Sequence, residues 1–593
     1  MMSKSIIQIV RDRIITKHAN DKEQIEIIFS PLKRILVEAP AGYGKTNTMV
    51  SKIAYMIADR QILNPKRLLA LTFSVNAAYK IKKDVTQQVP LLLKDSGLNI
   101  STIDKIFVSN YHGFCRGILR KYGMVFSPNF QSIDQLKSID DNDVRRNQET
   151  IKGLVYEDAY LMSEFSLAIK TGNEKYLTKN FDNYNDIIIK KFLPAGYISY
   201  NAILTLVLKL FREYPNILKF YNQYFNSLLI DEYQDTNILC FWIVYLLISE
   251  STKVILFGDS LQRIYGFIGA VHNLLPISET KFALKKIQLT TNHRFATNPD
   301  MLQLDSNIRR NAENPGSPQI KKNVIIKLFT FETQSKEALA VAKTADKMTH
   351  QNPGTKVAIL VKQRGGNVDS IIEALEMQHI PYFYGLFTDE DVKYIQFHKR
   401  ALNEFIELIK IKNHITKKLS VEHIKKMKGK QDEANEVMEN ALLGLLEIFW
   451  TKIFSNYPSS SNDEKIILIK DTFEHNSLKQ YMEFVKSNIV LSTVHAAKGL
   501  EWDYVIIPDM EQESFPNWIG GLCNKGGCAY KSNCHLQINK TNEIAFIEEL
   551  SVFYVAVTRA RKQIYFTASK IDSRGYSKNL SCLLKLPGIT YSK

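Results

Sequence analysis

Short apolar runs separated by amphipathic, helix-like stretches recur along the chain. Each run is bounded by polar or turn-forming residues, which is typical of strands that are buried on both faces of a parallel sheet. The sequence therefore predicts an α/β protein with more than one parallel sheet. The predicted strands are Ile35–Val37, Leu68–Phe73, Leu228–Ile230, Val254–Phe257, Val357–Val361, Ile489–Ser492, Tyr504–Ile507 and Ile564–Phe566.

Two long intervals lack this pattern, residues 120–225 and 385–485. Both are rich in Lys, Asn, Glu and Leu, and we interpret them as helical insertions into the series of strands. The longest apolar run, Ile238–Ile248, is well short of the roughly 20 residues that a membrane-spanning helix needs. It predicts a buried helix, and we expect no membrane partner.

The composition adds a partner class and a compartment. The chain has 593 residues with 77 Lys and Arg against 61 Asp and Glu, a net charge of +16. That length predicts several domains, and the positive balance favours a polyanionic partner such as nucleic acid. Six cysteines are too few for a disulfide scaffold, which favours a reducing cytoplasm.

A candidate phosphate-binding loop follows the first predicted strand. Glycines there let backbone N–H groups surround phosphate oxygens, and the helix that follows adds the favourable charge of its N-terminus. Lys45 would reach the β- and γ-phosphates, and the Thr46 hydroxyl would hold Mg²⁺. Ala39 stands where the strict pattern has Gly. The loop comprises Ala39, Pro40, Ala41, Gly42, Tyr43, Gly44, Lys45 and Thr46.

An acidic pair ends a second predicted strand, as such a loop requires. Asp231 and Glu232 come directly after Leu228–Ile230. Asp231 would bind Mg²⁺ through water, and Glu232 would activate the water that attacks the γ-phosphate. These residues alone predict a magnesium-dependent NTPase.

The acidic pair also opens a specific string. Residues 231–237, DEYQDTN, resemble the DE[FY]QDT motif of the UvrD/Rep/PcrA group of superfamily 1 helicases. Gln24 matches the glutamine of that group that reads adenine, and Ala is common in the group at the position of Ala39. Further motifs of the group follow in chain order, at residues 71–78 (LTFSVNAA), 110–114 (NYHGF), 258–267 (GDSLQRIYGF), 289–294 (LTTNHR), 493–501 (TVHAAKGLE) and 554–560 (YVAVTRA).

The resemblance implies a fold. It predicts two RecA-like P-loop NTPase lobes, each interrupted by a helical insertion, with ATP bound between the lobes and DNA across them. The first lobe would comprise residues 1–119 and 226–280, with residues 120–225 inserted. The second lobe would comprise residues 281–384 and 486–593, with residues 385–485 inserted.

The resemblance also implies roles for individual residues. Gln262 would sense the γ-phosphate, and Arg294 and Arg559 would stabilise the charge that develops on it. His293 and Glu501 would join the ATP site, although the group usually has Tyr at the position of His293. The group usually has Arg at the position of Ile268, so this chain lacks the arginine of that motif. The residues expected to contact DNA are Thr72, Phe73, Asn76, Tyr111, His112, Tyr265, Phe267 and His495.

A cluster of cysteines lies between the fifth and sixth of these motifs. Cys523, Cys528, Cys534 and His535 could hold zinc, which needs four converging ligands. Adjacent Cys534 and His535 rarely both reach one ion. The alternative is a loop with reduced thiols.

The sequence leaves three functions open. The first is an ATP- and Mg²⁺-dependent DNA helicase or translocase that moves 3′ to 5′ on single-stranded or partly duplex DNA. The second keeps the motor but changes its role, because the length resembles the helicase subunits of anti-phage systems such as Gabija; cutting would then need a partner nuclease. The third is a sensor that binds ATP and DNA without unwinding.

Overall fold

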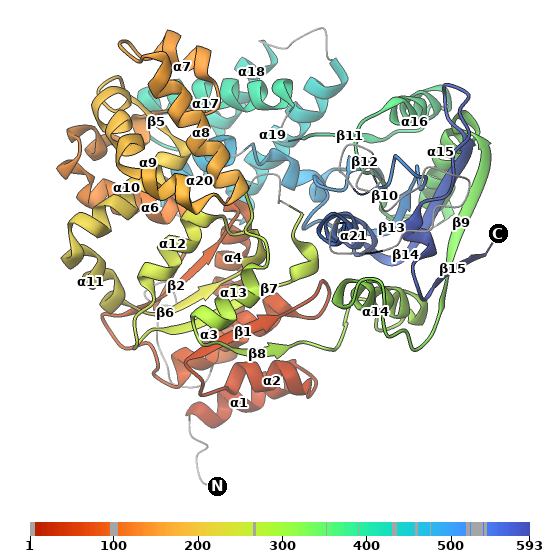
Figure 1. Cartoon of the computed structure of the whole chain (residues 1–593), viewed down its shortest axis with the longest axis horizontal. Coiled ribbons are helices and arrows are strands. Elements are labelled where there is room, and N and C mark those ends of the chain that lie inside the picture. The colour runs from red at the N-terminus through yellow and green to blue at the C-terminus, as the bar shows by residue number, and fades with distance from the viewer. Residues whose placement is uncertain are drawn as a thin grey trace. The chain divides into compact units, whose positions relative to one another are not determined.

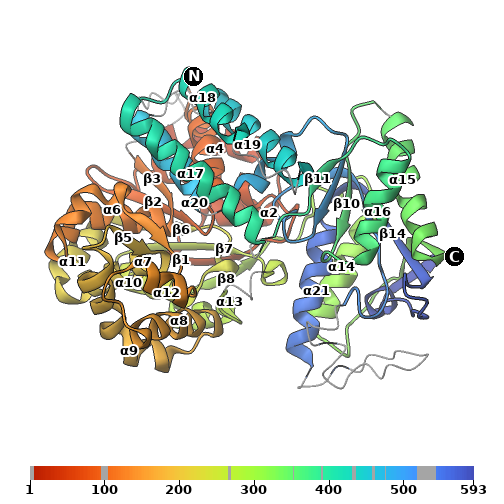
Figure 2. The same cartoon turned by 90° about the horizontal axis from the view of Figure 1, so that it is seen from above.

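A computed structural model describes most of the chain. The described residues are 6–94, 105–264, 269–351, 353–388, 391–429, 436–456, 461–474, 476–516, 522, 538 and 542–592. The chain forms two compact units, Met1–Thr291 and Asn292–Lys593, which are described separately below (Figures 1 and 2). Among the described residues, no helix is both long enough and apolar enough to cross a membrane.

The first unit is built on a six-stranded sheet in which all neighbouring strands are parallel. The strand order is β3-β2-β6-β7-β1-β8. The strand that precedes the phosphate loop, β1, therefore lies next to the edge strand β8. The strands are β1 (Arg34–Glu38), β2 (Arg67–Thr72), β3 (Ile106–Asn110), β6 (Phe225–Ile230), β7 (Lys253–Gly258) and β8 (Lys285–Gln288).

Alternate residues of these strands enter two different hydrophobic cores. In β1, Ile35 and Val37 belong to one core and Leu36 to the other. In β6, Leu229 joins the first core, while Leu228 and Ile230 join the second. Because side chains alternate across a strand, the two cores lie on opposite faces of the sheet. Each core also contains helix residues, so helices cover both faces. This explains why the central strands appear as unbroken apolar runs in the sequence.

The helices of the first unit divide between these two cores. The core that contains Ile35 also takes residues from α1 to α4, such as Val10, Ile14 and Met49. The other core takes α6, α12 and α13 together with the inserted helices α8 to α10. The helices are α1 (Ile6–Lys17), α2 (Lys22–Phe29), α3 (Lys45–Ala58), α4 (Val75–Leu93), α6 (Tyr111–Tyr122), α7 (Val144–Thr150), α8 (Tyr156–Thr171), α9 (Glu174–Ile187), α10 (Tyr200–Glu213), α11 (Pro215–Tyr224), α12 (Ile238–Leu247) and α13 (Leu274–Lys281); β4 (Lys137–Ile139) and β5 (Tyr197–Ser199) form a small parallel pair.

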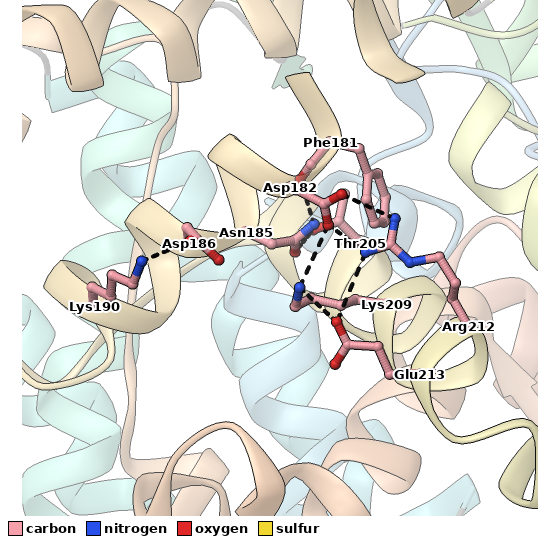
Figure 3. Close-up of polar contacts among 9 residues, drawn as sticks. All are labelled: Phe181, Asp182, Asn185, Asp186, Lys190, Thr205, Lys209, Arg212 and Glu213. Atoms are coloured by element: carbon pink, nitrogen blue, oxygen red, sulfur yellow. Dashed lines mark hydrogen bonds and ion pairs between the residues drawn. The ribbon is translucent and has the colours of Figure 1, made fainter. Parts of the chain in front are cut away.

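Two inserted helices are joined by both buried and exposed polar contacts (Figure 3). The buried contact runs from Thr205 Oγ1 on α10 to Asn185 Oδ1 on α9, at 2.8 Å. On the surface, Asp182 of α9 pairs with Arg212 and with Lys209, and Lys209 also pairs with Glu213 at 2.7 Å. Exposed ion pairs contribute about 1 kcal/mol at most, so the buried apolar contacts dominate the packing of this pair.

The second unit is built on a seven-stranded sheet with the order β11-β12-β10-β13-β14-β9-β15. Its paired strands are again parallel, with one register shift between β13 and β14 near Trp502. The strands are β9 (Val324–Thr333), β10 (Val357–Val361), β11 (Phe383–Gly385), β12 (Ile489–Thr493), β13 (Trp502–Ile507), β14 (Ala560–Ile571) and β15 (Ile589–Ser592).

Within the described part of the second unit, four helices flank this sheet and four more lie between β11 and β12. The flanking helices are α14 (Pro299–Glu313), α15 (Gln334–Gln351), α16 (Gly366–Met377) and α21 (Glu543–Val557). The inserted helices are α17 (Val392–Lys412), α18 (Lys417–Lys428), α19 (Glu436–Asn456) and α20 (Asn462–Glu474). Trp450 anchors the insertion, since its side chain is buried and its Nε1 donates a hydrogen bond to His423 Nδ1 at 3.1 Å.

These findings confirm the α/β prediction. Seven of the eight apolar runs lie wholly within a strand, the run Leu68–Phe73 extends one residue past β2, and the run at 238–248 forms α12 up to Leu247. One boundary differs from the expected one: the resemblance places residues 281–291 in the second lobe, whereas β8 pairs with β1 in the first sheet. The reason is that β8 is an edge strand with one buried residue, Ile287, so it left no apolar run.

Candidate functional site

The candidate site lies at the carboxyl edge of the first sheet. Here β1 and β7 end side by side, because Ala39 N donates a hydrogen bond to Gly258 O at 2.9 Å. β6 and β2 likewise end together, because Asp231 N donates to Leu71 O at 2.9 Å. The predicted phosphate loop, acidic pair and γ-phosphate sensor all follow these strand ends. This edge is where ligands bind in open α/β sheets.

The predicted phosphate loop is a tight turn that leads directly into α3. Gly42 and Gly44 have φ of +85° and +80°, a region that disfavours side chains other than hydrogen. Gly44 precedes the first residue of α3, Lys45. The free N–H groups of that first turn suit a phosphate. Thr46 follows in the same turn and is half-buried.

Lys45 joins the phosphate loop to the acidic pair. Its Nζ lies 3.3 Å from Asp231 Oδ1 and also forms an ion pair with Glu232 Oε1. Burial lowers the pKa of Lys45, but attraction from both carboxylates outweighs it, so the pKa lies above its ordinary value. Burial raises the pKa of Asp231, and Lys45 opposes that rise. A cation and two carboxylates thus converge where a metal–phosphate group would lie.

A chain of hydrogen bonds continues from Glu232 to the predicted γ-phosphate sensor. Gln234 Nε2 donates to Glu232 Oε2 at 2.6 Å, and Gln234 Oε1 accepts from Asp259 N at 3.1 Å. Asp259 Oδ2 in turn accepts from Gln262 Nε2 at 2.7 Å. Gln234 is buried and packs closely against Gly258, since a Cβ on that glycine would come 3.2 Å from its Oε1. Gln234 lies in the motif at residues 231–237, but the sequence alone assigns it no role.

Gln24, the predicted adenine reader, lies against the phosphate loop. Its Nε2 is 3.4 Å from Tyr43 O, and a Cβ on Gly44 would come 2.5 Å from the same atom. Its other partners are Asp21 and His18. His18 belongs to no motif of the sequence, and its place in the site follows from the folded geometry.

The residues expected to contact DNA differ in how deeply their side chains are buried. Phe73 is half-buried beyond the end of β2, while Thr72 is fully buried. Tyr111 is 1% exposed, and its hydroxyl lies 3.3 Å from Thr236 Oγ1. His112 is also buried and stacks on Tyr200, with ring centroids 3.6 Å apart. Tyr111 and His112 therefore pack inside the first unit, which is a structural position. Tyr265, Phe267 and the side chain of Asn76 lie outside the described residues.

In the second unit, the two predicted arginines share one small region. Arg294 donates to Thr558 O and pairs with Glu501. Arg559, 3% exposed, donates to Val555 O at 2.9 Å and to Leu500 O at 3.1 Å. Burial raises the pKa of Glu501, but Arg294 and Arg559 lower it to below its ordinary range. The structure thus brings Arg294, Arg559 and Glu501 together, with Arg559 bonded to the backbone of its own unit.

The remaining predicted residues either lie apart from these groups or fall outside the described residues. His293 is exposed at the start of the second unit, and His495 is half-buried after β12. Cys523, Cys528, Cys534 and His535, the proposed zinc ligands, all lie outside the described residues.

A separate group of carboxylates that the sequence did not single out lies in the second unit, with Glu337 and Glu511 buried and Asp509 half-buried. Ligand oxygens of Glu337, Asp509 and Glu511 lie within 4.8 Å of one another. Glu337 Oε1 accepts from Asp509 N at 3.1 Å and Thr567 Oγ1 at 2.5 Å, and Glu511 Oε1 accepts from Ser569 Oγ at 3.0 Å. Burial and the neighbouring Asp509 raise the pKa of Glu511 to about 7. A cavity of about 700 Å³ reaches Asp509.

Comparison with known families gives two matches in chain order. Residues 20–283 match the UvrD/REP helicase N-terminal domain, and residues 393–571 match the UvrD-like helicase C-terminal domain. Each match falls largely within one of the two compact units.

Individual relatives are similar over nearly the whole chain. A probable DNA helicase II homologue of Rickettsia conorii is 25% identical over 93% of this chain and 92% of its own length. The ATP-dependent DNA helicase Rep of Buchnera aphidicola is 24% identical over 92% of each chain. The ATP-dependent DNA helicase PcrA of Staphylococcus epidermidis is 24% identical over 92% of this chain and 83% of its own.

Proposed function

The chain belongs to the UvrD/Rep family of helicases, and we propose that it is an ATP-dependent DNA helicase. The observation that carries this proposal is the contact of Lys45 with both Asp231 and Glu232 at the end of a phosphate loop. A lysine, a metal-binding carboxylate and a candidate general base at one sheet edge are the parts that phosphoryl transfer needs. The relatives named as ATP-dependent DNA helicases support the same function.

The residues of the first unit would bind and hydrolyse ATP. The N–H groups of the loop and Lys45 would bind the β- and γ-phosphates, while Gln24 would read the base. Thr46 and Asp231 offer the oxygen ligands that Mg²⁺ prefers, and the bound ion would offset the charge of the phosphates. Glu232, held by Gln234, would accept the proton of the attacking water.

Arg294 and Arg559 would supply positive charge during hydrolysis. In the described structure, the guanidinium of Arg559 donates to backbone carbonyls of the second unit, so reaching a phosphate would redirect some of its N–H groups. Such an exchange would tie hydrolysis to a conformational change. An arginine that reaches the γ-phosphate stabilises the transition state and accelerates hydrolysis by about 10³–10⁵-fold.

We further propose that the motor moves 3′ to 5′ on single-stranded or partly duplex DNA. Phe73 and His495 are half-buried and follow strand ends, so among the described residues they are candidates for contact with bases. A partner nuclease, as in an anti-phage complex, is compatible with this function and needs its own test.

The decisive experiment measures ATP hydrolysis with and without single-stranded DNA, and then strand displacement on duplexes with a 3′ or a 5′ tail. We expect hydrolysis to depend on DNA and displacement to require the 3′ tail. Hydrolysis without displacement would indicate a translocase, binding of both ligands without hydrolysis would indicate a sensor, and displacement from the 5′ tail alone would reverse the polarity. Copurification of a nuclease would support the defence role.

A further inference from the structure

The side chain of Gln24 is fixed from three directions. It is 3% exposed and lies at the start of α2. Asp21, which caps that helix, accepts from Gln24 N at 3.0 Å and from Gln24 Nε2 at 3.1 Å. On its other sides the amide meets Tyr43 O of the phosphate loop and the ring of His18. The amide therefore cannot rotate without losing buried hydrogen bonds.

Its neighbours identify which end of the amide is nitrogen. Both Asp21 Oδ2 and Tyr43 O can only accept hydrogen bonds, so the group that faces them must be the NH₂. The oxygen, Oε1, consequently faces His18 Nδ1. Two adjacent acceptors would repel each other, so Nδ1 of His18 carries the hydrogen and donates it to Gln24.

The far side of the His18 ring is anchored on the helix that follows the phosphate loop. His18 Nε2 lies 2.8 Å from Ser51 Oγ on α3, and the ring is 4% exposed. With Nδ1 protonated in the neutral ring, Nε2 accepts from the serine hydroxyl. The hydrogen bonds thus run in one direction, from Ser51 through His18 and Gln24 to Asp21.

The direction of the Gln24 amide matters for base recognition. A purine with a 6-amino group presents a donor beside the N7 acceptor, and this pair matches an amide oxygen beside an amide N–H. A 6-oxo purine presents two acceptors, and one of them would face the amide oxygen. Gln24 Oε1 has two lone pairs and Nε2 has two hydrogens, so the amide can keep His18 and Asp21 while it binds adenine.

We propose that His18 is a positioning residue that fixes the amide orientation of Gln24 and thereby sets the preference for ATP over GTP. This inference rests on the proposed function, because it assigns a role within the same nucleotide site. Without the N–H of His18, the amide loses the partner that holds its oxygen in place. The amide oxygen is then no longer kept where it accepts from a 6-amino group, so ATP binding weakens and the preference for ATP over GTP falls.

Three substitutions at His18 separate this role from simple packing. His18→Leu removes both ring nitrogens. His18→Asn keeps an N–H close to the position of Nδ1, while His18→Gln is also polar but carries its amide one bond further out. We would measure kcat and KM for ATP and GTP at saturating single-stranded DNA, and the affinities of fluorescent ATP and GTP analogues without turnover. Ser51→Ala is the control for the far end of the chain of hydrogen bonds.

We expect the ratio of kcat/KM for ATP to that for GTP to fall about tenfold or more in His18→Leu and His18→Gln, which corresponds to the loss of one buried hydrogen bond. The change should lie in KM and in analogue affinity, with kcat within about twofold. His18→Asn should stay within about threefold of the parent, and Ser51→Ala should have a smaller effect.

The outcomes distinguish this inference from the proposed function. A parent protein that hydrolyses no nucleotide would overturn both. A parent that hydrolyses ATP, with His18→Gln and His18→Leu folded and equally selective, would overturn only the role of His18. Equal losses in His18→Asn and His18→Gln would also overturn it, because packing rather than the N–H would then be responsible. If His18→Leu does not fold, the comparison of Asn with Gln decides.

Discussion

Lys45 Nζ lies 3.3 Å from Asp231 Oδ1, so the cation of the phosphate loop directly contacts the carboxylate that ends β6. Lys45 also pairs with Glu232, and it therefore neutralises part of an acidic pair that is held at one sheet edge. When ATP binds, the phosphates would compete for the same ammonium. Its release from the carboxylates would leave Asp231 available for metal and Glu232 for water.

Lys45→Ala should abolish ATP hydrolysis while the fold persists. The substitution removes the charge partner of the phosphates and leaves two carboxylates without their cation. Steady-state hydrolysis at saturating single-stranded DNA measures the loss, with Asn47→Ala on the exposed side of the same helix as the control. Near-normal hydrolysis by Lys45→Ala would refute the assignment of the phosphate loop.

Gln234→Glu should slow hydrolysis and move its pH dependence to higher pH. The new carboxylate still accepts from Asp259 N, but it replaces the N–H that Gln234 donates to Glu232. A like charge at this distance favours protonation of Glu232, so its pKa rises and more alkaline conditions are needed to restore the base. We expect kcat to fall at least tenfold at pH 7 and to recover partly by pH 9.

The pH profile of kcat, compared with that of the near-isosteric Gln234→Met, checks this prediction. Gln234→Met should lower kcat without the alkaline shift, since it adds no charge. If both variants have the same pH profile as the parent, Gln234 does not act through Glu232.

Arg559→Ala should retain most ATP binding and lose DNA-stimulated turnover by about 10³-fold. Nucleotide affinity and turnover are measured together at saturating DNA. Because Arg559 also donates to Val555 O and Leu500 O, its loss should lower the melting temperature of the second unit. Arg559→Lys is the control for charge: it should recover little activity, since an ammonium lacks the planar fork of guanidinium. Turnover within a few-fold of the parent in Arg559→Ala would exclude a direct role.

The second unit should lose stability as the pH rises from about 5 to about 8. Burial and Asp509 raise the pKa of Glu511 to about 7 in the folded state, so between its ordinary pKa and pH 7 the folded state binds more protons than the unfolded state. Stability is therefore greatest at low pH within this window and decreases as Glu511 ionises. The loss should be on the order of 2 kcal/mol, since each unit of pKa shift corresponds to about 1.4 kcal/mol.

Urea denaturation at several pH values, in the parent and in Glu511→Gln, measures this effect. The variant cannot ionise at this position and should show a flatter dependence. Glu407→Gln, on the exposed side of α17, is the matched control and should behave like the parent. A parent whose stability rises over the same range would contradict the prediction.

The sequence predicted the central strands because they are buried on both faces. β10, for example, is buried at all five positions and stands out as an apolar run. The strands that the pattern missed are exposed on one side or short. β9 alternates between buried and exposed residues over its first half, and β8 has a single buried residue, so neither forms such a run. Such strands are identified by their pairing, which is a property of the folded chain.

The candidate site, like the fold, could be predicted from the sequence only in part. The loops after strand ends could be located because their residue types are required by phosphate chemistry. The orientation of Gln24, the burial of Tyr111 and the backbone contacts of Arg559 depend on residues that are distant in sequence, such as Ser51, Thr236 and Leu500. His18 carries no motif, and only its hydrogen bonds to Gln24 and Ser51 assign it to the site.

The hydrophobic core that joins the first sheet to its inserted helices has a consequence for truncation. Leu36 and Ile230 of the sheet belong to the same core as Phe165 and Leu204 of the insertion. Residues 120–225 are thus an insertion in the order of the chain but an inseparable part of the interior. Excising them would expose to water the part of this core that the inserted helices cover, so this segment and the nucleotide site should melt in one cooperative step, and shortened versions of the unit would aggregate rather than act as a minimal ATPase.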